Sequence, residues 1–190
     1  MLRYDLINKY IKEIGATSYL EIGVFRGDCF RRIVVENKQA VDPNKNSAAT
    51  IFKTSDDYFK DTDDMYDVVF IDGMHEGYQV YRDIKNSLKH LNKGGVILLH
   101  DCNPPTKERQ RPFEPGHSMG AWNGDCWKGF VKFRTESNYL TFTYDTDEGV
   151  GVIDTRYNAE PLTGFDHEIS EMTYEMLVVD RQRLLNLRKV

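Results

Sequence analysis

Residues 66–72 read Tyr-Asp-Val-Val-Phe-Ile-Asp, and the residues from Val68 to Ile71 form an apolar run without a polar interruption. Such a strand is typical of a parallel sheet covered by helices on both faces, because neither side of the strand then meets water. Further along the chain, residues 78–91 place apolar side chains at helical spacing, and residues 96–99 form a second apolar run. A buried strand, a helix and another buried strand in succession predict an α/β fold.

The rest of the chain continues this alternation of short apolar runs and helical patterns. We therefore expect a three-layer α/β/α, doubly wound fold with a mostly parallel sheet. Two strands flanking an Asp-Thr-Asp-Glu-Gly turn predict an antiparallel hairpin near the C-terminus, followed by one more helix. The predicted strands are residues 19–24, 40–42, 50–54, 66–72, 96–99, 140–144 and 150–154, and the predicted helices are residues 3–14, 29–36, 78–91, 127–133 and 168–188.

The composition is that of a folded domain with a modest negative charge. Of 190 residues, 40% are hydrophobic and 12% are aromatic, which is enough to bury a core, and we expect a single domain over residues 1–190. The formal net charge of −5 leaves no basic excess to neutralise a nucleic-acid backbone. We therefore expect no nucleic-acid partner.

The sequence also bears on where the protein is located. No apolar run is long enough to cross a bilayer, and Asp5 and Lys9 lie where a secretion signal needs apolar residues. We therefore expect no membrane association and a cytoplasmic protein. Cys29, Cys102 and Cys126 have no paired spacing, and we interpret them as reduced thiols.

The first predicted strand is followed by a glycine turn. Residues 21–28 read Glu-Ile-Gly-Val-Phe-Arg-Gly-Asp, in which Gly23 and Gly27 permit a tight turn and a close approach of the backbone to a ligand. Ligands of open parallel sheets bind beyond the carboxyl ends of the strands, which makes this turn a candidate site. It departs from the dinucleotide pattern GxGxxG, because Phe25 replaces the middle glycine and no third glycine follows.

Two later strand ends carry residues suited to an adenosine. Asp42 follows the second predicted strand, where a carboxylate can accept hydrogen bonds from both ribose hydroxyls. Ser55 and Asp56 follow the third predicted strand and are candidates to accept a hydrogen bond from the exocyclic amine of a purine. Each has a plainer alternative, because Asp42 with Pro43 is a common turn and Ser55 with Asp56 can cap a helix.

Four segments at these strand ends together resemble a known family. They are residues 19–27 (YLEIGVFRG), 41–43 (VDP), 70–75 (FIDGMH) and 94–101 (GGVILLHD). In this order they resemble the class I S-adenosylmethionine-dependent methyltransferases, which have a Rossmann-like fold. The similarity is greatest to the small single-domain group with IDGxH and GGxxxxHD segments, and it covers a core of about residues 15–155.

The resemblance implies a seven-stranded sheet with a reversed final strand, S-adenosylmethionine as cofactor, and O-methylation of a small molecule or a saccharide. In that family, Glu21, Gly23 and Gly27 would shape the pocket for the methionine moiety, and Asp72 would face the sulfonium and the acceptor. One departure is that residues 44–50 are too few for the helix usually found between the second and third strands. The cofactor-binding residues expected from the resemblance are Glu21, Gly23, Phe25, Gly27, Asp42, Ser55, Asp56 and Asp72.

Two carboxylates, Asp72 and Asp101, end adjacent strands of this fold. Hard oxygen ligands of this kind suit Mg²⁺, which can lower the pKa of an acceptor hydroxyl, so both are candidate metal ligands. Adjacent carboxylates repel each other, and the pattern therefore favours either a divalent ion or a raised pKa on one of the acids. In the catechol-type metal-dependent O-methyltransferases an asparagine ligand follows the second aspartate, whereas Cys102 stands there in this chain and Asn103 comes one residue later.

The alternative to a metal is a general base. His75 and His100 lie close in sequence to the two aspartates, and a neutral imidazole near pH 7 is suited to removing a proton from a hydroxyl. We leave the two routes open. The candidate catalytic residues are Asp72, His75, His100 and Asp101.

Residues 103–123 form the one long segment without periodicity, and they are rich in Pro, Gly and charge. We expect a loop over the acceptor site, in which basic side chains receive a carboxylate or phosphate and aromatic side chains cover a sugar or ring. A solvated surface loop is the plainer interpretation of the basic residues, and His117 is a weaker candidate base. The side chains concerned are Lys107, Arg109, Arg111, Trp122 and, just beyond the segment, Trp127.

Two other functions stay open on the sequence. A nicotinamide-dependent oxidoreductase also needs an acid after the second strand, although the missing glycines count against it. A non-catalytic member of the fold would bind a nucleoside without turnover, which fold-level similarity alone does not exclude. The C-terminal helix predicted at residues 168–188 packs either on its own sheet or on a second subunit, and a homodimer is also left open.

Overall fold

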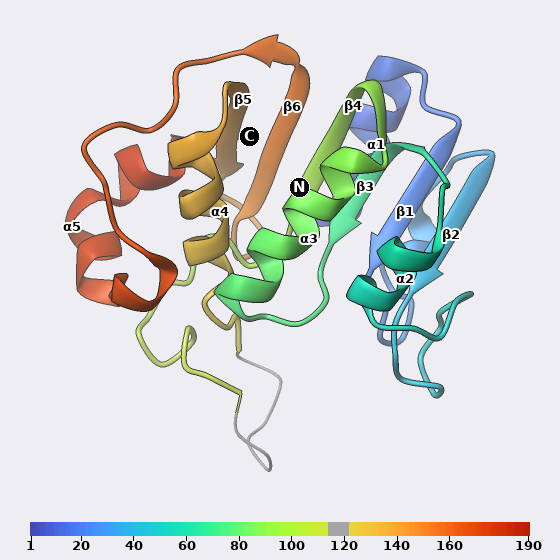
Figure 1. Ribbon diagram of the computed structural model, residues 1–190, viewed down its shortest axis with the longest axis horizontal. Coiled ribbons are helices and arrows are strands. Elements are labelled where there is room, and N and C mark those ends of the chain that lie inside the picture. Colours follow the sequence, from blue (N-terminus) through green and yellow to red (C-terminus); the bar gives the residue numbers. More distant parts are fainter. Residues whose placement is uncertain (114–121) are drawn as a thin grey trace.

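The computed structural model describes residues 1–113 and 122–190, and its strands form one seven-stranded sheet (Figure 1). The strand order is β2-β1-β3-β4-β6-β5-β7. Each strand is parallel to its neighbours except β6, which is antiparallel to both β4 and β5. This confirms the predicted α/β fold with a mostly parallel sheet and an antiparallel hairpin. The strands are β1 Ser18–Ile22, β2 Asn37–Val41, β3 Tyr66–Ile71, β4 Leu91–Leu99, β5 Tyr139–Tyr144, β6 Val150–Asn158 and β7 Leu187–Arg188.

Helices cover both faces of the sheet, as the apolar run in β3 predicted. Val68 and Phe70 pack into the core under α1, whereas Val69 and Ile71 pack into the core under α3 and α4 on the opposite face (Figure 1). No helix among the described residues has both the length and the apolar character needed to cross a lipid bilayer. The helices are α1 Arg3–Ile14, α2 Ser55–Asp61, α3 Gly77–Lys89, α4 Cys126–Glu136 and α5 Tyr174–Leu185, with short 3-10 helices η1 Phe30–Arg32 and η3 Ile169–Glu171.

The helix predicted over residues 29–36 is wrong, because only η1 forms between β1 and β2. The glycine turn uses residues 23–28, which leaves residues 29–36 to return to the start of β2. To return to the start of β2, the chain must travel back along the five-residue β1, a distance of about 16 Å. A helix needs about 11 residues to cover that distance. The segment is too short for that and is extended apart from η1.

The third strand predicted over residues 50–54 is reduced to one bridge between Ile51 and the end of β2. The chain then enters α2 directly, because the Thr54 side chain caps the helix by accepting a backbone N–H of its first turn. Ser55 and Asp56 therefore begin a helix rather than follow a strand. A helix does begin here, but its N-cap is Thr54 rather than Ser55 or Asp56, which are the first two residues of the helix.

The single C-terminal helix predicted over residues 168–188 is also wrong. The segment forms η3 and then α5, which ends at Leu185, because Asn186 adopts the left-handed conformation with φ 47°. Leu187 and Arg188 then pair with β5 as the short edge strand β7. The sheet thus has seven strands, as expected, but the seventh is the C-terminal strand β7 and not the strand expected at residues 50–54.

Candidate active site

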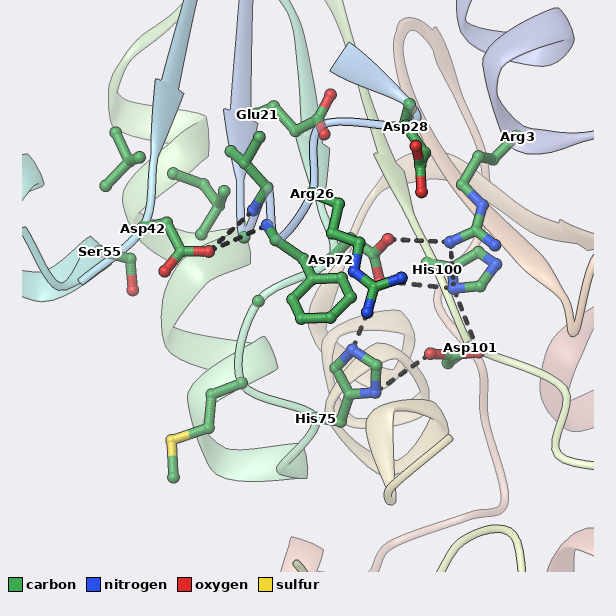
Figure 2. A pocket seen from close by; sticks show the side chains of 18 of the residues that line it. Arg3, Glu21, Arg26, Asp28, Asp42, Ser55, Asp72, His75, His100 and Asp101 are labelled. Atoms are coloured by element: carbon green, nitrogen blue, oxygen red, sulfur yellow. Dashed lines mark hydrogen bonds and ion pairs between the residues drawn. The ribbon is translucent and has the colours of Figure 1, made fainter. Parts of the chain in front are cut away.

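A cavity of about 1030 Å³ opens where the carboxyl ends of β1, β2, β3 and β4 meet. Figure 2 shows Asp42 and Ser55 on one side of it, and Asp72, His75 and Asp101 on the other. Among the residues singled out from the sequence as cofactor-binding or catalytic, Gly27 alone does not line the cavity. Parallel strands bring residues from four separate parts of the chain to one edge of the sheet.

The glycine turn is shaped by backbone packing. Gly23 has φ 82°, and a Cβ built on it would lie 2.2 Å from the carbonyl oxygen of Asp72. Gly27 has φ 76°, and its Cβ would lie 2.7 Å from the Cβ of Ala48. Both glycines are therefore required by neighbouring protein atoms. The close approach of a ligand that we expected at both glycines stays a prediction, and of the two only Gly23 lines the cavity.

Asp42 holds the glycine turn in place. Its Oδ2 accepts hydrogen bonds from the backbone N–H groups of Val24 and Phe25, each at 3.1 Å, and its Oδ1 accepts the N–H of Asn44 at 2.8 Å. Phe25 is held with φ 46°, an uncommon conformation for a bulky residue, and is 62% exposed at the cavity. Each carboxylate oxygen has two acceptor positions, so Oδ1 keeps a free one for a ligand.

Glu21 is buried at 1% exposure, and its carboxylate accepts a hydrogen bond from the Tyr19 hydroxyl at 2.6 Å. Burial raises the pKa of Glu21 to about 7, although the bond from Tyr19 acts in the opposite direction. A buried carboxylate with a pKa near 7 has lost much of the solvation of its charged form. A cationic group of a ligand can replace that solvation and stabilise the charged carboxylate.

Asp72, His75, His100 and Asp101 form a carboxylate–histidine cluster (Figure 2). Oδ1 of Asp72 lies 3.4 Å from Nε2 of His75 and 3.4 Å from Nδ1 of His100. The carboxylate of Asp101 lies 3.1 Å from Nδ1 of each histidine. The strand ends at residues 72 and 101 therefore do meet, and both histidines lie between them.

The pKa values show how the charges of this cluster are balanced. Burial alone would raise the pKa of Asp72, but His100 and His75 outweigh it and lower that pKa far below its usual range. Burial would lower the pKa of both histidines, but the surrounding aspartates raise it instead. The sequence favoured a divalent ion or a raised pKa on one of the two acids, and Asp72 is not an acid with a raised pKa. Positively charged neighbours balance its charge.

Arg3 and Asp147 belong to the same site, although the sequence did not single them out. Nη1 of Arg3 lies 3.0 Å from Oδ2 of Asp72 and 3.2 Å from Nδ1 of His100, and its Nε donates to Asp147 at 3.0 Å. Asp147 lies in the turn between β5 and β6, 3.7 Å from Nε2 of His100. The contacts of Arg3 join residues between 69 and 144 positions apart in sequence, so no local pattern could have identified them.

The residues directly after Asp101 point elsewhere. Cys102 is fully buried with its Sγ toward backbone carbonyls, and Asn103 bonds to the side chains of Asp145 and Arg181. An amide does reach Asp101, but it comes from Asn123, whose Nδ2 donates to Oδ1 of Asp101 at 2.6 Å. The Oδ1 of Asn123 is buried and has no hydrogen-bond partner within residues 1–113 and 122–190.

Only the two ends of the segment 103–123 are described, and His117 lies outside the described residues. The Trp122 ring stacks on His75, with centroids 4.9 Å apart and planes 15° apart, and Arg109 pairs with Glu148 at 2.8 Å. Both Trp122 and Arg109 line the cavity. The other three do not line it: Lys107 pairs with Glu175, Arg111 donates to a backbone carbonyl, and Trp127 is buried.

The cluster has the donors that a divalent cation needs. One ligand atom each of Asp72, His75 and Asp101 can lie within 4.8 Å of the others. Nδ1 of His75 is buried without an aligned hydrogen bond among the described residues. The two carboxylates are ligands that suit hard ions such as Mg²⁺ or Mn²⁺, whereas the imidazole is typical of borderline transition-metal ions. The chemistry of these residues therefore fits a metal, with His75 in place of the asparagine of the catechol-type enzymes.

Residues 20–102 match a family model described as a methyltransferase domain, and a search of curated proteins found no match. Solved structures with a similar fold include an O-methyltransferase from Bacillus cereus in complex with SAH, at 13% identity and TM-score 0.57, with 80% of each chain covered. Another is the O-methyltransferase TomG from Streptomyces achromogenes, involved in tomaymycin synthesis and solved with SAM, at 16% identity and TM-score 0.58, covering 80% of this chain and 79% of that one.

A third is the SAH-bound methyltransferase PaMTH1 from Podospora anserina, at 15% identity and TM-score 0.56, covering 80% of this chain and 77% of that one. At these identities the likeness concerns the fold. The matched domain spans the strands β1 to β4 that build the cavity. Residues 20–102 are thus similar to a methyltransferase domain, and the fold of the chain is similar to that of methyltransferases solved with SAM or SAH.

Proposed function

We propose that the protein transfers the methyl group of S-adenosylmethionine to a hydroxyl oxygen of a small molecule. The observation that carries the proposal is the position of Asp72. Its backbone packs directly on Gly23 of the glycine turn, and its carboxylate belongs to the carboxylate–histidine cluster. One residue thus joins the part of the cavity suited to the cofactor to the part suited to an acceptor.

At the cofactor end, each polar group of S-adenosylmethionine has a suitable partner. Asp42 is suited to the ribose hydroxyls and Glu21 to the ammonium of the methionine moiety, while Ser55 and Asp56 are suited to the adenine. When bound, the cofactor supplies a methyl group on a sulfonium, already activated for in-line transfer. The protein then mainly has to hold the two reactants aligned.

At the acceptor end, a hydroxyl must lose its proton. The surrounding aspartates raise the pKa of both His75 and His100, which favours the protonated form of each ring in the ligand-free protein, and a protonated imidazole cannot accept a proton. The other route is a divalent cation held by Asp72, Asp101 and His75, in which His75 would have to bind as a neutral imidazole. When bound, such a cation would lower the pKa of the acceptor hydroxyl.

The lining of the acceptor end is suited to a polyhydroxylated molecule such as a saccharide. It combines the carboxylates of Asp101 and Glu148 with the amide of Asn123, all of which can bond to hydroxyl groups. Trp122 adds an aromatic surface at the same place. Arg3 and Arg109 are paired with carboxylates, whereas Arg26, which also lines the cavity, has no ion pair among the described residues.

The test is calorimetric titration of the purified protein with S-adenosylhomocysteine and, separately, with NAD⁺. We expect binding of the first and none of the second. Turnover is then followed as formation of S-adenosylhomocysteine from S-adenosylmethionine with a panel of saccharides and phenols. Binding of NAD⁺ alone would favour an oxidoreductase, and binding without turnover on any acceptor would favour a non-catalytic nucleoside-binding protein.

A further inference from the structure

Gln79 is a polar side chain at the cavity that the proposed reaction does not use. It lies in the first turn of α3 and is 9% exposed. Its Nε2 donates to Oδ1 of Asp83 at 2.9 Å, to Oγ of Ser55 at 3.2 Å and to Oδ1 of Asp56 at 3.3 Å. One amide therefore connects α3 to the first turn of α2.

Asp83 is the anchor of this arrangement. It lies one helical turn after Gln79, is 1% exposed and does not line the cavity, whereas Gln79, Ser55 and Asp56 do line it. Its Oδ2 has no hydrogen-bond partner among the described residues, and its Oδ1 accepts the hydrogen bond from Gln79. Burial raises the pKa of Asp83 to about 6, which is consistent with a carboxyl that does not need its charge for this contact.

Arg82 completes the arrangement from the solvent side. Its guanidinium donates to Oε1 of Gln79 and lies 3.2 Å from Oδ2 of Asp56. Asp56 therefore has one carboxylate oxygen facing Gln79 and the other facing Arg82. Its side chain is otherwise 47% exposed on a short helix, so these two contacts define its orientation.

The fold explains why such a connection is needed. The strand expected at residues 50–54 would have held this side of the cavity by a ladder of backbone hydrogen bonds, but only the bridge at Ile51 is formed. α2 is seven residues long and carries Ser55 and Asp56 in its first turn. Side-chain hydrogen bonds from α3 supply part of the fixation that the reduced strand does not.

We infer that Gln79 and Asp83 are positioning residues that orient the Asp56 carboxylate toward the exocyclic amine of the adenine and so make the site select 6-aminopurines over 6-oxopurines. This inference rests on the proposed function, since it concerns the base of the same cofactor. A fixed carboxylate accepts a hydrogen bond from the amine of adenine, whereas it repels the 6-oxo oxygen of hypoxanthine. A carboxylate that is free to turn can shift to the N1–H of hypoxanthine instead, and the selectivity is then lost.

The experiment compares S-adenosylhomocysteine with S-inosylhomocysteine, which differs from it only around C6 of the base. Dissociation constants for both are measured by calorimetry on the wild type and on Gln79→Ala, Asp83→Ala and Asp83→Asn. We expect the wild type to prefer the adenosyl compound by at least about tenfold. Gln79→Ala and Asp83→Ala should reduce that ratio several-fold, and Asp83→Asn, which keeps an acceptor oxygen for Gln79, should retain it.

The ratio of the two dissociation constants distinguishes a loss of positioning from a loss of stability. A variant that is only destabilised loses affinity for both compounds equally, and its ratio does not change. Tyr78→Ala is the matched control, since Tyr78 lies in the same turn of α3, is 54% exposed and does not line the cavity. A wild type without preference, or a ratio unchanged in Gln79→Ala and Asp83→Ala, overturns the inference. If Gln79→Ala does not fold, Asp83→Ala against Asp83→Asn decides in its place. Absence of any S-adenosylhomocysteine binding to the wild type contradicts the proposed function itself.

Discussion

The guanidinium of Arg3, at the first position of α1, forms an ion pair of 3.0 Å with the carboxylate of Asp72, at the end of β3. The same side chain also bonds to Asp147, and the backbone N–H of Arg3 donates to that carboxylate at 2.7 Å. The start of the first helix is thus part of the wall of the cavity. Arg3 competes with any cation that would bind Asp72.

Arg3→Gln should therefore have two effects in opposite directions. The free energy of unfolding should fall by about 2 kcal/mol, because two partly buried carboxylates lose their partner. Affinity for Mg²⁺ should rise, because Oδ2 of Asp72 becomes available. Urea unfolding and calorimetric titration measure the two effects. Lys53→Gln, which breaks the exposed pair with Asp61, is the control and should change neither by much. Weaker Mg²⁺ binding in Arg3→Gln would contradict the competition.

Gly23→Ala should prevent folding or cost at least about 3 kcal/mol of stability, because its Cβ would overlap the backbone of Asp72 at a positive φ. Gly15→Ala is the matched control. Gly15 has φ 64° but no atom within 4 Å of its Cβ, so this change should cost only about 1 to 2 kcal/mol. Thermal and denaturant unfolding distinguish the two. Equal losses in both variants would show that backbone conformation alone, without the contact to Asp72, sets the requirement.

Glu21 should make the stability of the ligand-free protein depend on pH. Its pKa rises from 4.5 in the unfolded chain to about 7 in the folded protein. Between these values the folded protein keeps a proton that the unfolded chain releases, so the free energy of unfolding contributed by Glu21 falls as the pH rises. The loss over this window is about 3 kcal/mol.

Glu21→Gln removes this titration while keeping the shape of the side chain. The difference in unfolding free energy between variant and wild type, measured by urea at pH 5 and pH 8, should therefore shift in favour of the variant at the higher pH. Other carboxyl groups, such as Asp72, affect both proteins equally and cancel in the difference. A difference that does not change with pH would show that Glu21 titrates at its ordinary value.

Asp42 should hold the ribose of the cofactor, and Asp42→Ala should weaken binding of S-adenosylhomocysteine by about tenfold or more. Because Asp42 also anchors the backbone at Val24 and Phe25, the loss alone does not identify the ribose contact. The 2′-deoxy analogue of S-adenosylhomocysteine separates the two roles. It should bind the wild type more weakly than the parent compound, and the difference should vanish in Asp42→Ala. An undiminished difference would place the 2′-hydroxyl elsewhere.

If a divalent cation is used, EDTA should suppress turnover and Mg²⁺ should restore it. Asp101→Asn should lose this response while keeping cofactor affinity near that of the wild type. Asparagine is chosen because Asp101 has φ 58°, a conformation that asparagine tolerates better than alanine. Activity that ignores EDTA and instead depends on a group titrating near neutrality, lost in His75→Ala or His100→Ala, would assign the role to a histidine.

The sequence by itself was sufficient for the α/β architecture and for several of the residues that line the cavity. The apolar run in β3 requires cover on both faces, and the ends of parallel strands must meet at one edge, so Glu21, Asp42, Asp72 and Asp101 could be placed together before any coordinates. The helix at residues 3–14 was also predicted with its observed bounds, because its apolar positions repeat at the helical period. These features depend on local periodicity and on chain order.

Other features were decided only by the tertiary structure. Residues 29–36 could not form a full helix because the chain has to return along the length of β1. The strand expected at residues 50–54 is replaced by the start of α2, which Thr54 caps. Arg3 and Asp147 reach the cluster through contacts between distant parts of the chain, and Asp147 is one of the aspartates that raise the pKa of His100. A sequence pattern records neighbours along the chain, whereas ion pairs, burial and pKa values depend on neighbours in space.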